Sequence, residues 1–455
     1  MAVRHFCLDI ETEGLVHIGN GNQYGKKDYF ASKDKIAILD VRKFTSRLNA
    51  GQVERYCAFL EGKDKAGNLQ FFLTKNQDLK KIAMQSIAYL IDSPLPKHDV
   101  WEFVKDPYGK PYVPGSSVKG MLRTVILLNL LLKDESYKSL ITSSVENASA
   151  NRNIAKRADR QIVKKAFSKK PNGSADADEI NIMKYISVAD SNPLSTDDLV
   201  FAKKYDQFSK NDPADHKLEM RKPTVKEGNK LSICRECLQP GTKISIEIAI
   251  DDRIDSCLGG SMLDAHGIQT MLKKWFDFYS KCFLNSFEEG TGSTQSISGS
   301  SADDRCNYIF QAGSMAGTRC RNNAINNTGY CRLHQDEVNK QKISSKITCY
   351  LGGGVDFVSK TVVGALFNSD EKRLEVISRI LYSQFPTKVD PAFYPLLMKK
   401  VSQAGFSPKS LKKGKEDHRH WRDQELGVSP HTMKYGLVGK KKYPMGKCNV
   451  SIREI

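Results

Sequence analysis

The segment Tyr112-Val-Pro-Gly-Ser-Ser-Val-Lys-Gly-Met-Leu-Arg123 contains the clearest structural signal in the sequence. Pro114 and Gly115 end the strand that is expected before them, and either of the next two serines can cap a helix. The residues that follow are almost all apolar, which predicts a helix over 118–132. This helix is expected to be too short to cross a bilayer.

The same helix start carries groups that suit a phosphate. Backbone N–H groups at a helix N-terminus attract anions. Lys119 and Arg123 are four residues apart, so they share a helix face and add charge there. The predicted contacts are Ser116, Ser117, Lys119 and Arg123. An ordinary capped core helix is the alternative.

Two glycine-rich segments are further candidates for RNA contact, because glycine lets a backbone approach a ligand closely. The first follows a strand predicted over 4–11 and is expected to be a loop as far as residue 25; a flexible turn is its alternative. The second lacks the spacing of a phosphate-binding P-loop, which argues against ATP hydrolysis. The candidate residues are His17, Gly19, Gly21, Lys26 and Lys27 in the first segment and Gly352, Gly353, Gly354, Ser359 and Lys360 in the second.

Residues 143–180 are polar and basic and are expected to form a mobile insertion. Lys156, Arg160 and Lys164 recur every fourth residue, so a helix here would carry a positive stripe able to follow a phosphate backbone. A solvated helix face is the alternative.

Cysteine and histidine gather in a segment that has too few apolar residues to build a core. Cys306, Cys320, Cys331 and His334 follow a low-complexity linker at 290–302, and Cys331-Arg-Leu-His334 resembles half of a zinc knuckle. Four such donors suit tetrahedral zinc, which would supply folding energy. We predict structural zinc here. The alternative is that the four residues are unrelated and lie in a disordered loop. Cys234 and Cys237 form a lone Cys-x-x-Cys, which we interpret as incidental.

Composition favours a polyanionic partner. The 455 residues include 70 Lys and Arg against 52 Asp and Glu, for a formal charge of +18 and a pI near 9.2. We find no signal peptide, spanning run or lipidation motif, and therefore expect no membrane partner. Eleven cysteines without an export signal indicate reduced thiols and a cytoplasmic location.

The motif Pro-Gly-Ser-Ser-x-Lys-Gly-x-x-Arg resembles the signature of the RAMP proteins, the RNA-binding subunits of CRISPR effector complexes. Segments 14–21 and 187–191 are similar to the fifth-subunit family of type III-A (Csm) complexes, as are 236–242, 351–361, 430–434 and 445–448, in the same order. The resemblance implies an α+β fold with two ferredoxin-like (RRM-like) halves. The expected segments are an N-terminal ferredoxin-like domain at 1–142, the basic insertion at 143–180, a second half beginning at 181–289, the linker and zinc insertion at 290–345, and a C-terminal part at 346–455.

The resemblance also implies a function. It indicates a non-enzymatic subunit that binds crRNA, caps the 3′-proximal end of the guide and ends the backbone filament. The implied partners are crRNA, the backbone RAMP and small subunits and, indirectly, target RNA. One alternative is an endoribonuclease of crRNA maturation that uses His17 or His418 with His420. The other is a scaffold that recruits host nucleases for 3′ trimming.

Overall fold

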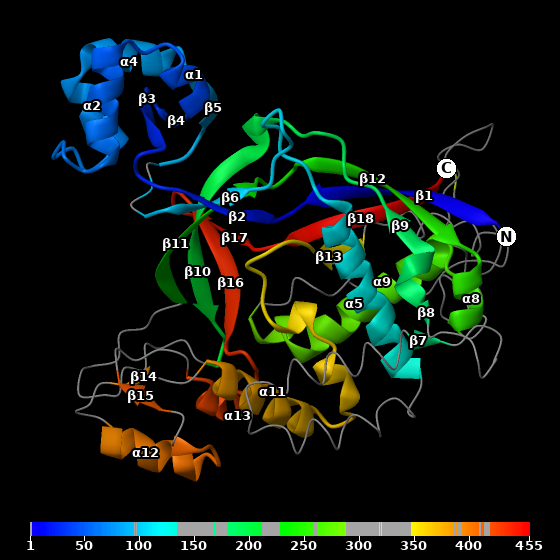
Figure 1. The fold of residues 1–455 in the computed structure, drawn as a ribbon. Helices are drawn as coiled ribbons and strands as arrows, with labels where there is room; N and C mark the ends of the chain where they lie inside the picture. Colours follow the sequence, from blue (N-terminus) through cyan, green and yellow to red (C-terminus); the bar gives the residue numbers. More distant parts are fainter. Residues whose placement is uncertain are drawn as a thin grey trace.

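The protein has a mixed α+β architecture with several sheets, as expected (Figure 1). The structure is a computed structural model. It describes residues 2–94, 96, 98–133, 168–169, 180–211, 228–258, 262–287, 318, 320, 347–385, 388–389, 394–408, 411–413 and 419–455.

The central element is an antiparallel five-stranded sheet in the order β13-β18-β1-β12-β9. Its strands are β1 (Val3–Thr12), β9 (Ile186–Val188), β12 (Lys243–Asp251), β13 (Ile347–Tyr350) and β18 (Lys447–Glu454). Isoleucines alternate with polar residues along β12, so every second side chain is buried against the helices. The strand predicted over 4–11 is confirmed as β1.

Two helices, α5 (Gly115–Lys133) and α9 (Ala265–Cys282), pack against each other and against this sheet (Figure 1). The Asp264 side chain caps α9 by accepting from the N–H of Gly267. The largest apolar core of the described chain lies between these helices and the sheet. The helix predicted over 118–132 corresponds to α5, which begins three residues earlier.

The prediction that α5 is too short to cross a bilayer is wrong. The helix begins at Gly115 and has 19 residues, and it is the one described helix long and apolar enough by composition to cross a membrane. Its length therefore does not exclude a membrane. Its packing argues for a core helix, because Val118, Leu122 and Val125 are buried in the main core beside α9.

A second sheet has six strands in the order β17-β16-β10-β11-β6-β2. They are β2 (Gly19–Tyr24), β6 (Val100–Phe103), β10 (Leu199–Phe208), β11 (Gly228–Leu238), β16 (Thr432–Val438) and β17 (Lys441–Pro444). The glycine-rich segment expected to be a loop as far as residue 25 contains strand β2, which pairs with β6 at the sheet edge. Gly19 pairs with Phe103 across these strands, so the absence of a side chain there does not prevent pairing.

Residues 26–92 form a lobe that the sequence did not predict (Figure 1, blue). Its elements are β3 (Tyr29–Ser32), β4 (Lys35–Leu39), α1 (Val41–Thr45), α2 (Ala50–Leu60), α3 (Leu69–Lys75), α4 (Gln77–Met84) and β5 (Ile87–Ile91). Asn49 and Gln52 form a reciprocal capping box at the start of α2. Phe44, Phe59 and Phe72 are buried in a core of its own.

The remaining elements are short or belong to the C-terminal region. They are β7 (Ser168–Lys169), β8 (Ile180–Asn181), η2 (Ile182–Tyr185), η3 (Thr196–Asp198), α8 (Arg253–Cys257), η4 (Leu284–Ser286), η5 (Val358–Lys360), η6 (Val363–Leu366), α11 (Asp370–Gln384), β14 (Lys388–Val389), α12 (Tyr394–Gln403), β15 (Lys412–Lys413), η9 (His420–Arg422) and α13 (Asp423–Leu426). Both large sheets combine strands from 1–142, 181–289 and 346–455, so the five segments stay a prediction about sequence organisation.

Candidate nucleic-acid interface

The start of α5 is held by a second family-like segment. The Gly115 N–H donates to the Asp190 carboxylate at 2.7 Å, and a Cβ at Gly115 would lie 2.2 Å from the Val188 carbonyl oxygen. Ser191 and Val113 exchange two hydrogen bonds of 2.9 Å. Only glycine therefore fits at the helix start, and a protein carboxylate already accepts from its N–H.

The side chains predicted on this helix face solvent. Ser116 is exposed, whereas Ser117, Lys119 and Arg123 are half-buried. Within the described part of the chain, neither Lys119 nor Arg123 has an ion pair or side-chain hydrogen bond. Their two charges are therefore available to an anion beside the helix start, even though Asp190 occupies the Gly115 N–H.

The two glycine-rich segments meet at His17. Gly353 donates its N–H to the His17 carbonyl at 2.5 Å, and a Cβ at Gly352 would lie 2.4 Å from the same oxygen. Gly352 has a φ of +84°, which L side chains rarely adopt. Only glycine lets the backbone at 352 approach the His17 carbonyl this closely. The segments 351–354 and 14–18 therefore form one junction between the two large sheets.

His17 itself is an interior residue of this junction. Its side chain is 6 % exposed, and its Nδ1–H donates to the Glu236 carbonyl at 2.7 Å. Burial lowers the pKa of His17 to about 4. The hydrogen bond to the Glu236 carbonyl acts in the opposite direction, and the charges of Arg235 and Lys105 act in the same direction as burial. The imidazole is therefore neutral at physiological pH and contributes to packing.

A fully buried carboxylate, Glu236, holds the junction from the β11 side. It accepts from Lys105 Nζ at 2.6 Å, the Tyr89 hydroxyl at 2.7 Å and the Phe103 N–H at 2.9 Å. The Lys105 ammonium also lies over the Tyr89 ring, 5.1 Å from its centroid. Every partner is a strong donor, so the buried charge is satisfied.

A cationic cluster formed by Lys204, Arg235 and Lys434 lies beside this junction on neighbouring strands β10, β11 and β16. Asp206 is the carboxylate within it, 3.6 Å from Lys204 Nζ and 3.0 Å from Lys434 Nζ. Burial and then the charge of Lys434 lower the pKa of Lys204, with Asp206 opposing. Three cations against one carboxylate leave an excess positive charge that suits an anion.

Arg235 connects this cationic cluster with the glycine-rich loop. A Cβ at Gly354 would lie 3.3 Å from the carbon of the Arg235 guanidinium, so the bare backbone makes room for that group. Among the described residues, the guanidinium has no ion pair or side-chain hydrogen bond. Its fork of donors is therefore not occupied by a described residue, and a fork of this kind matches the geometry of a phosphate.

The remaining residues of the second glycine-rich segment are more enclosed. Ser359 is buried, its N–H donates to the Asp356 carboxylate at 3.0 Å and its hydroxyl donates to the Asp356 carbonyl at 3.1 Å. Lys360 is exposed, and burial of its stem lowers its pKa. Ser359 thus shapes the loop, and Lys360 alone of the two offers a group to a ligand.

The other predicted contacts are dispersed. Gly19 and Gly21 are exposed on the edge strand β2, and Lys26 is exposed. The Lys27 ammonium donates to the Phe59 and Leu60 carbonyls, at 3.2 and 2.7 Å, and thereby caps the end of α2. The described residues do not include Lys156, Arg160 and Lys164 of the basic insertion. Of the four predicted zinc ligands they include only Cys320, which is buried; Cys306, Cys331 and His334 lie outside them.

The Cys-x-x-Cys pair is divided by the strand that carries it. Cys234 is buried with Phe201 and Ile91, whereas Cys237 is buried with Leu15 in a different apolar cluster. Residues three apart in a strand point to opposite faces. Burial raises the pKa of Cys234 to about 11, and it also raises that of Cys237. The geometry supports the interpretation of an incidental pair.

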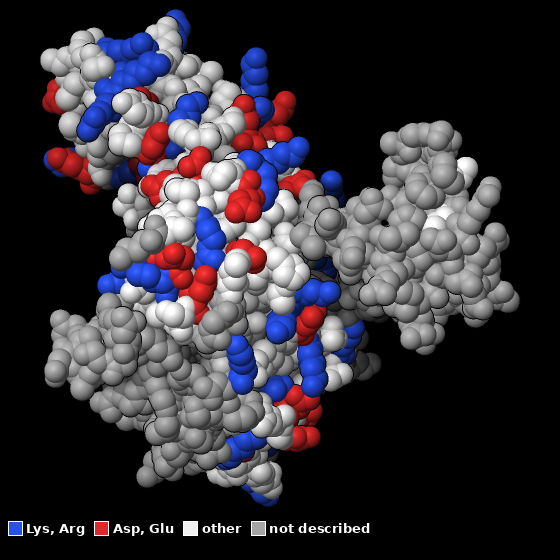
Figure 2. Space-filling model, turned by 90° about the vertical axis from the view of Figure 1, so that its right-hand side faces the viewer, with Lys and Arg blue, Asp and Glu red and all other residues white. Residues whose placement is uncertain are grey.

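The net charge of the chain does not form one continuous patch on the face in Figure 2. Blue Lys and Arg side chains are interspersed with red acidic ones over the described surface. The cationic cluster of Lys204, Arg235 and Lys434 is therefore a more specific candidate than overall charge. Sequence reasoning missed Lys204 and Arg235 because their shared face depends on strand pairing between distant segments.

Comparison with known proteins finds relatives of this chain among CRISPR proteins. The chain is 27% identical over 271 residues to "CRISPR system Cms protein Csm5" of Mycobacterium tuberculosis (strain CDC 1551 / Oshkosh), with 55% of this chain and 67% of that protein aligned. It is 28% identical over 260 residues to the Csm5 protein of Streptococcus thermophilus, covering 54% and 64%. The aligned region thus spans about two thirds of these relatives.

Solved structures extend the likeness over the whole fold. A chain in the cryo-EM structure of a Csm-crRNA-target RNA ternary complex of a type III-A CRISPR-Cas system superimposes with a TM-score of 0.52 at 15% identity, covering 99% of this chain and 100% of that one. At this identity the match shows the fold alone. The model of the RAMP superfamily matches residues 9–267, which is more than half of the 455 residues. The chain therefore belongs to the RAMP superfamily.

Proposed function

We propose that this chain is a structural subunit of a type III-A (Csm) effector complex that binds crRNA and caps the 3′-proximal end of the guide. The observation that carries the proposal is the cationic cluster beside the meeting point of the glycine-rich segments, with Arg235 seated over Gly354. The similarity to Csm5 proteins supports the assignment to this kind of complex.

The proposed mechanism is electrostatic and independent of base sequence. Lys204, Arg235 and Lys434 would bind phosphates, and Lys119 and Arg123 would add charge beside α5. Contacts of this kind fix the position of a strand without reading its bases. The proposed partners are crRNA, the backbone RAMP and small subunits that the chain would terminate, and target RNA indirectly.

Omission of the subunit tests the capping role. Csm complexes reconstituted without this chain should leave the 3′-proximal part of the guide open to ribonuclease, whereas complexes with it should protect that part. Protection that changes only at the 5′ tag would contradict the proposal.

Lys119→Ala combined with Arg123→Ala is expected to weaken guide retention without unfolding the protein. Both side chains have solvent contact and no described partner, so their loss removes charge and not packing. The measurement is RNA yield from the purified variant, with circular dichroism as the control for folding. An unchanged yield would remove these residues from the interface.

The order of strands and helices along the chain supports the proposal that one half of the fold is ferredoxin-like. A ferredoxin-like unit runs β-α-β-β-α-β. β1, α5, β9, β12, α9 and β13 follow this order along the chain, and their strands share the five-stranded sheet, with β18 between β13 and β1. Such a half would extend as far as β13, well past residue 142.

We propose no catalytic residue. His17 is buried with a pKa lowered to about 4, and His420 is buried beside Asp423. Neither position suits a general base that must reach RNA. His418 lies outside the described residues. A role in recruiting host nucleases stays a second proposal, because the 290–345 insertion could serve as the recruiter; a nuclease that co-purifies only when that insertion is present would favour it.

Structural zinc in the insertion stays a proposal that rests on the sequence. Cys306, Cys320, Cys331 and His334 would be the ligands. Cys331→Ser is expected to lower the zinc content by about one ion per chain, because a tetrahedral site needs all four donors. Elemental analysis of the wild type and the variant measures this, and equal zinc contents would exclude the knuckle. We further propose a cytoplasmic location, where such thiols stay reduced.

A further inference from the structure

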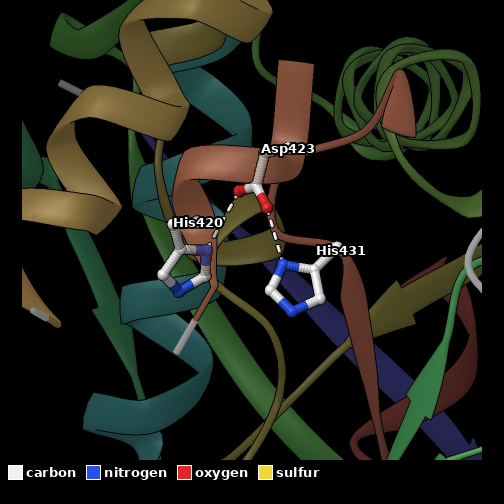
Figure 3. A group of neighbouring side chains, drawn as sticks. All are labelled: His420, Asp423 and His431. Carbon is white, nitrogen blue, oxygen red and sulfur yellow. Dashed lines mark hydrogen bonds and ion pairs between the residues drawn. The ribbon is translucent and has the colours of Figure 1, made fainter. Parts of the chain in front are cut away.

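Three buried side chains from the C-terminal region form a group that the proposed RNA interface does not use (Figure 3). They are His420 in η9, Asp423 at the start of α13 and His431 directly before β16. Their side chains are 8, 0 and 7 % exposed. We call them the His–Asp–His cluster.

The two imidazoles approach one carboxylate from either side (Figure 3). His420 Nδ1 lies 3.0 Å from Oδ2 of Asp423, and His431 Nδ1 lies 2.6 Å from Oδ1. The Ser429 hydroxyl donates to Oδ2 at 2.6 Å. Each carboxylate oxygen of Asp423 therefore contacts one imidazole nitrogen. His420 and Asp423 lie close together because they are three residues apart, within one helical turn.

The carboxylate at the centre of this cluster is fully buried. In the described part of the chain, Asp423 forms no ion pair with a lysine or arginine, and its partners there are the two imidazoles and the Ser429 hydroxyl. Buried carboxylates are paired or coordinate metals, so a metal cation held jointly with the two imidazoles suits this position.

The donor set also has the chemistry of a metal site. Imidazole nitrogen and carboxylate oxygen are ligands of zinc and similar divalent metals, at about 2.0–2.2 Å. One ligand atom from each of the three residues lies within 4.8 Å of the others. Because ligands at that bond length are separated by at most about 4 Å, small side-chain rotations would bring all three onto one ion.

We propose that His420, Asp423 and His431 bind a divalent transition-metal cation of the zinc class. Bound metal would fasten η9 and α13 to the start of β16, the strand that carries Lys434 of the cationic cluster. The site is separate from the predicted zinc knuckle, since it uses nitrogen and oxygen donors in place of thiolates.

Cobalt(II) binding distinguishes the His–Asp–His cluster from the predicted zinc knuckle in the full-length chain. In a Cys306→Ser/Cys331→Ser background, which disables the predicted knuckle, we expect about one Co²⁺ per chain, with visible d–d absorption and no thiolate charge-transfer band. Adding His431→Gln should abolish this binding, whereas His266→Gln, which removes an exposed histidine of α9, should leave it unchanged. Absence of bound Co²⁺ in the background protein, or equal binding after His431→Gln, would overturn the proposal.

A second measurement does not depend on the folding of the histidine variant. X-ray absorption of the Zn²⁺-loaded background protein should show only nitrogen and oxygen neighbours, with imidazole scattering. EDTA should lower its melting temperature. Sulfur neighbours, zinc without imidazole scattering or a melting temperature insensitive to EDTA would each mean that the cluster is a hydrogen-bonded structural group only.

Discussion

Glu236→Ala is expected to remove about 3–5 kcal/mol from the free energy of unfolding, the typical result of breaking a buried ion pair. The carboxylate is fully buried and accepts from Lys105, Tyr89 and the Phe103 N–H. Truncation removes the 2.6 Å partner of the Lys105 ammonium, which is 8 % exposed and keeps Glu102 at the longer distance of 3.5 Å. It also leaves a hydroxyl and a backbone N–H unsatisfied, each at its own cost.

Urea unfolding followed by tryptophan fluorescence measures this loss. Glu236→Gln should show a smaller loss, because the amide retains one acceptor oxygen. The matched control is Glu247→Ala, which removes an exposed glutamate of β12 and should change stability by less than about 0.5 kcal/mol. If Glu236→Ala unfolds at the same urea concentration as this control, the junction is not held by Glu236.

Arg235→Gln combined with Lys434→Gln is expected to weaken binding of single-stranded RNA by about 10–100-fold for each lost contact, the usual value of a hydrogen bond to a charged group. The two side chains belong to a cluster in which three cations face one carboxylate, Asp206. The slope of log affinity against log salt should fall by about 0.7 for each lost phosphate contact.

The control for this double variant removes the same charge elsewhere. Lys273→Gln with Lys274→Gln takes two exposed cations from α9, away from the cationic cluster. Filter binding at several salt concentrations compares the two proteins. Equal weakening in both would mean that RNA responds to the total charge of +18 and not to the proposed interface.

Local patterns predicted much of the fold. The Pro-Gly break before α5 and the strand predicted over 4–11 depend on neighbouring residues, and both elements form as expected. The lobe of residues 26–92 was missed because its short helices and strands are stabilised by a shared core, to which Phe30, Phe44 and Phe72 contribute from separate elements.

The site was harder to predict, because its contacts join distant parts of the chain. Asp190 meets Gly115 across 75 residues, and Lys105 meets Glu236 across 131. Lys27 was predicted from its place beside glycines, but its ammonium caps α2. The family-like segments at 14–18 and 351–354 were recognised one by one, and only strand pairing shows that they converge at His17.

We propose that this chain contacts the 3′-proximal part of the guide through the junction and the cationic cluster. UV crosslinking of the protein to the RNA that co-purifies with it locates that contact. Crosslinks are expected near the guide 3′ end, in peptides that contain Arg235 or Gly352–Gly354. Crosslinks confined to the repeat-derived 5′ tag, or no co-purifying RNA, would contradict the proposal.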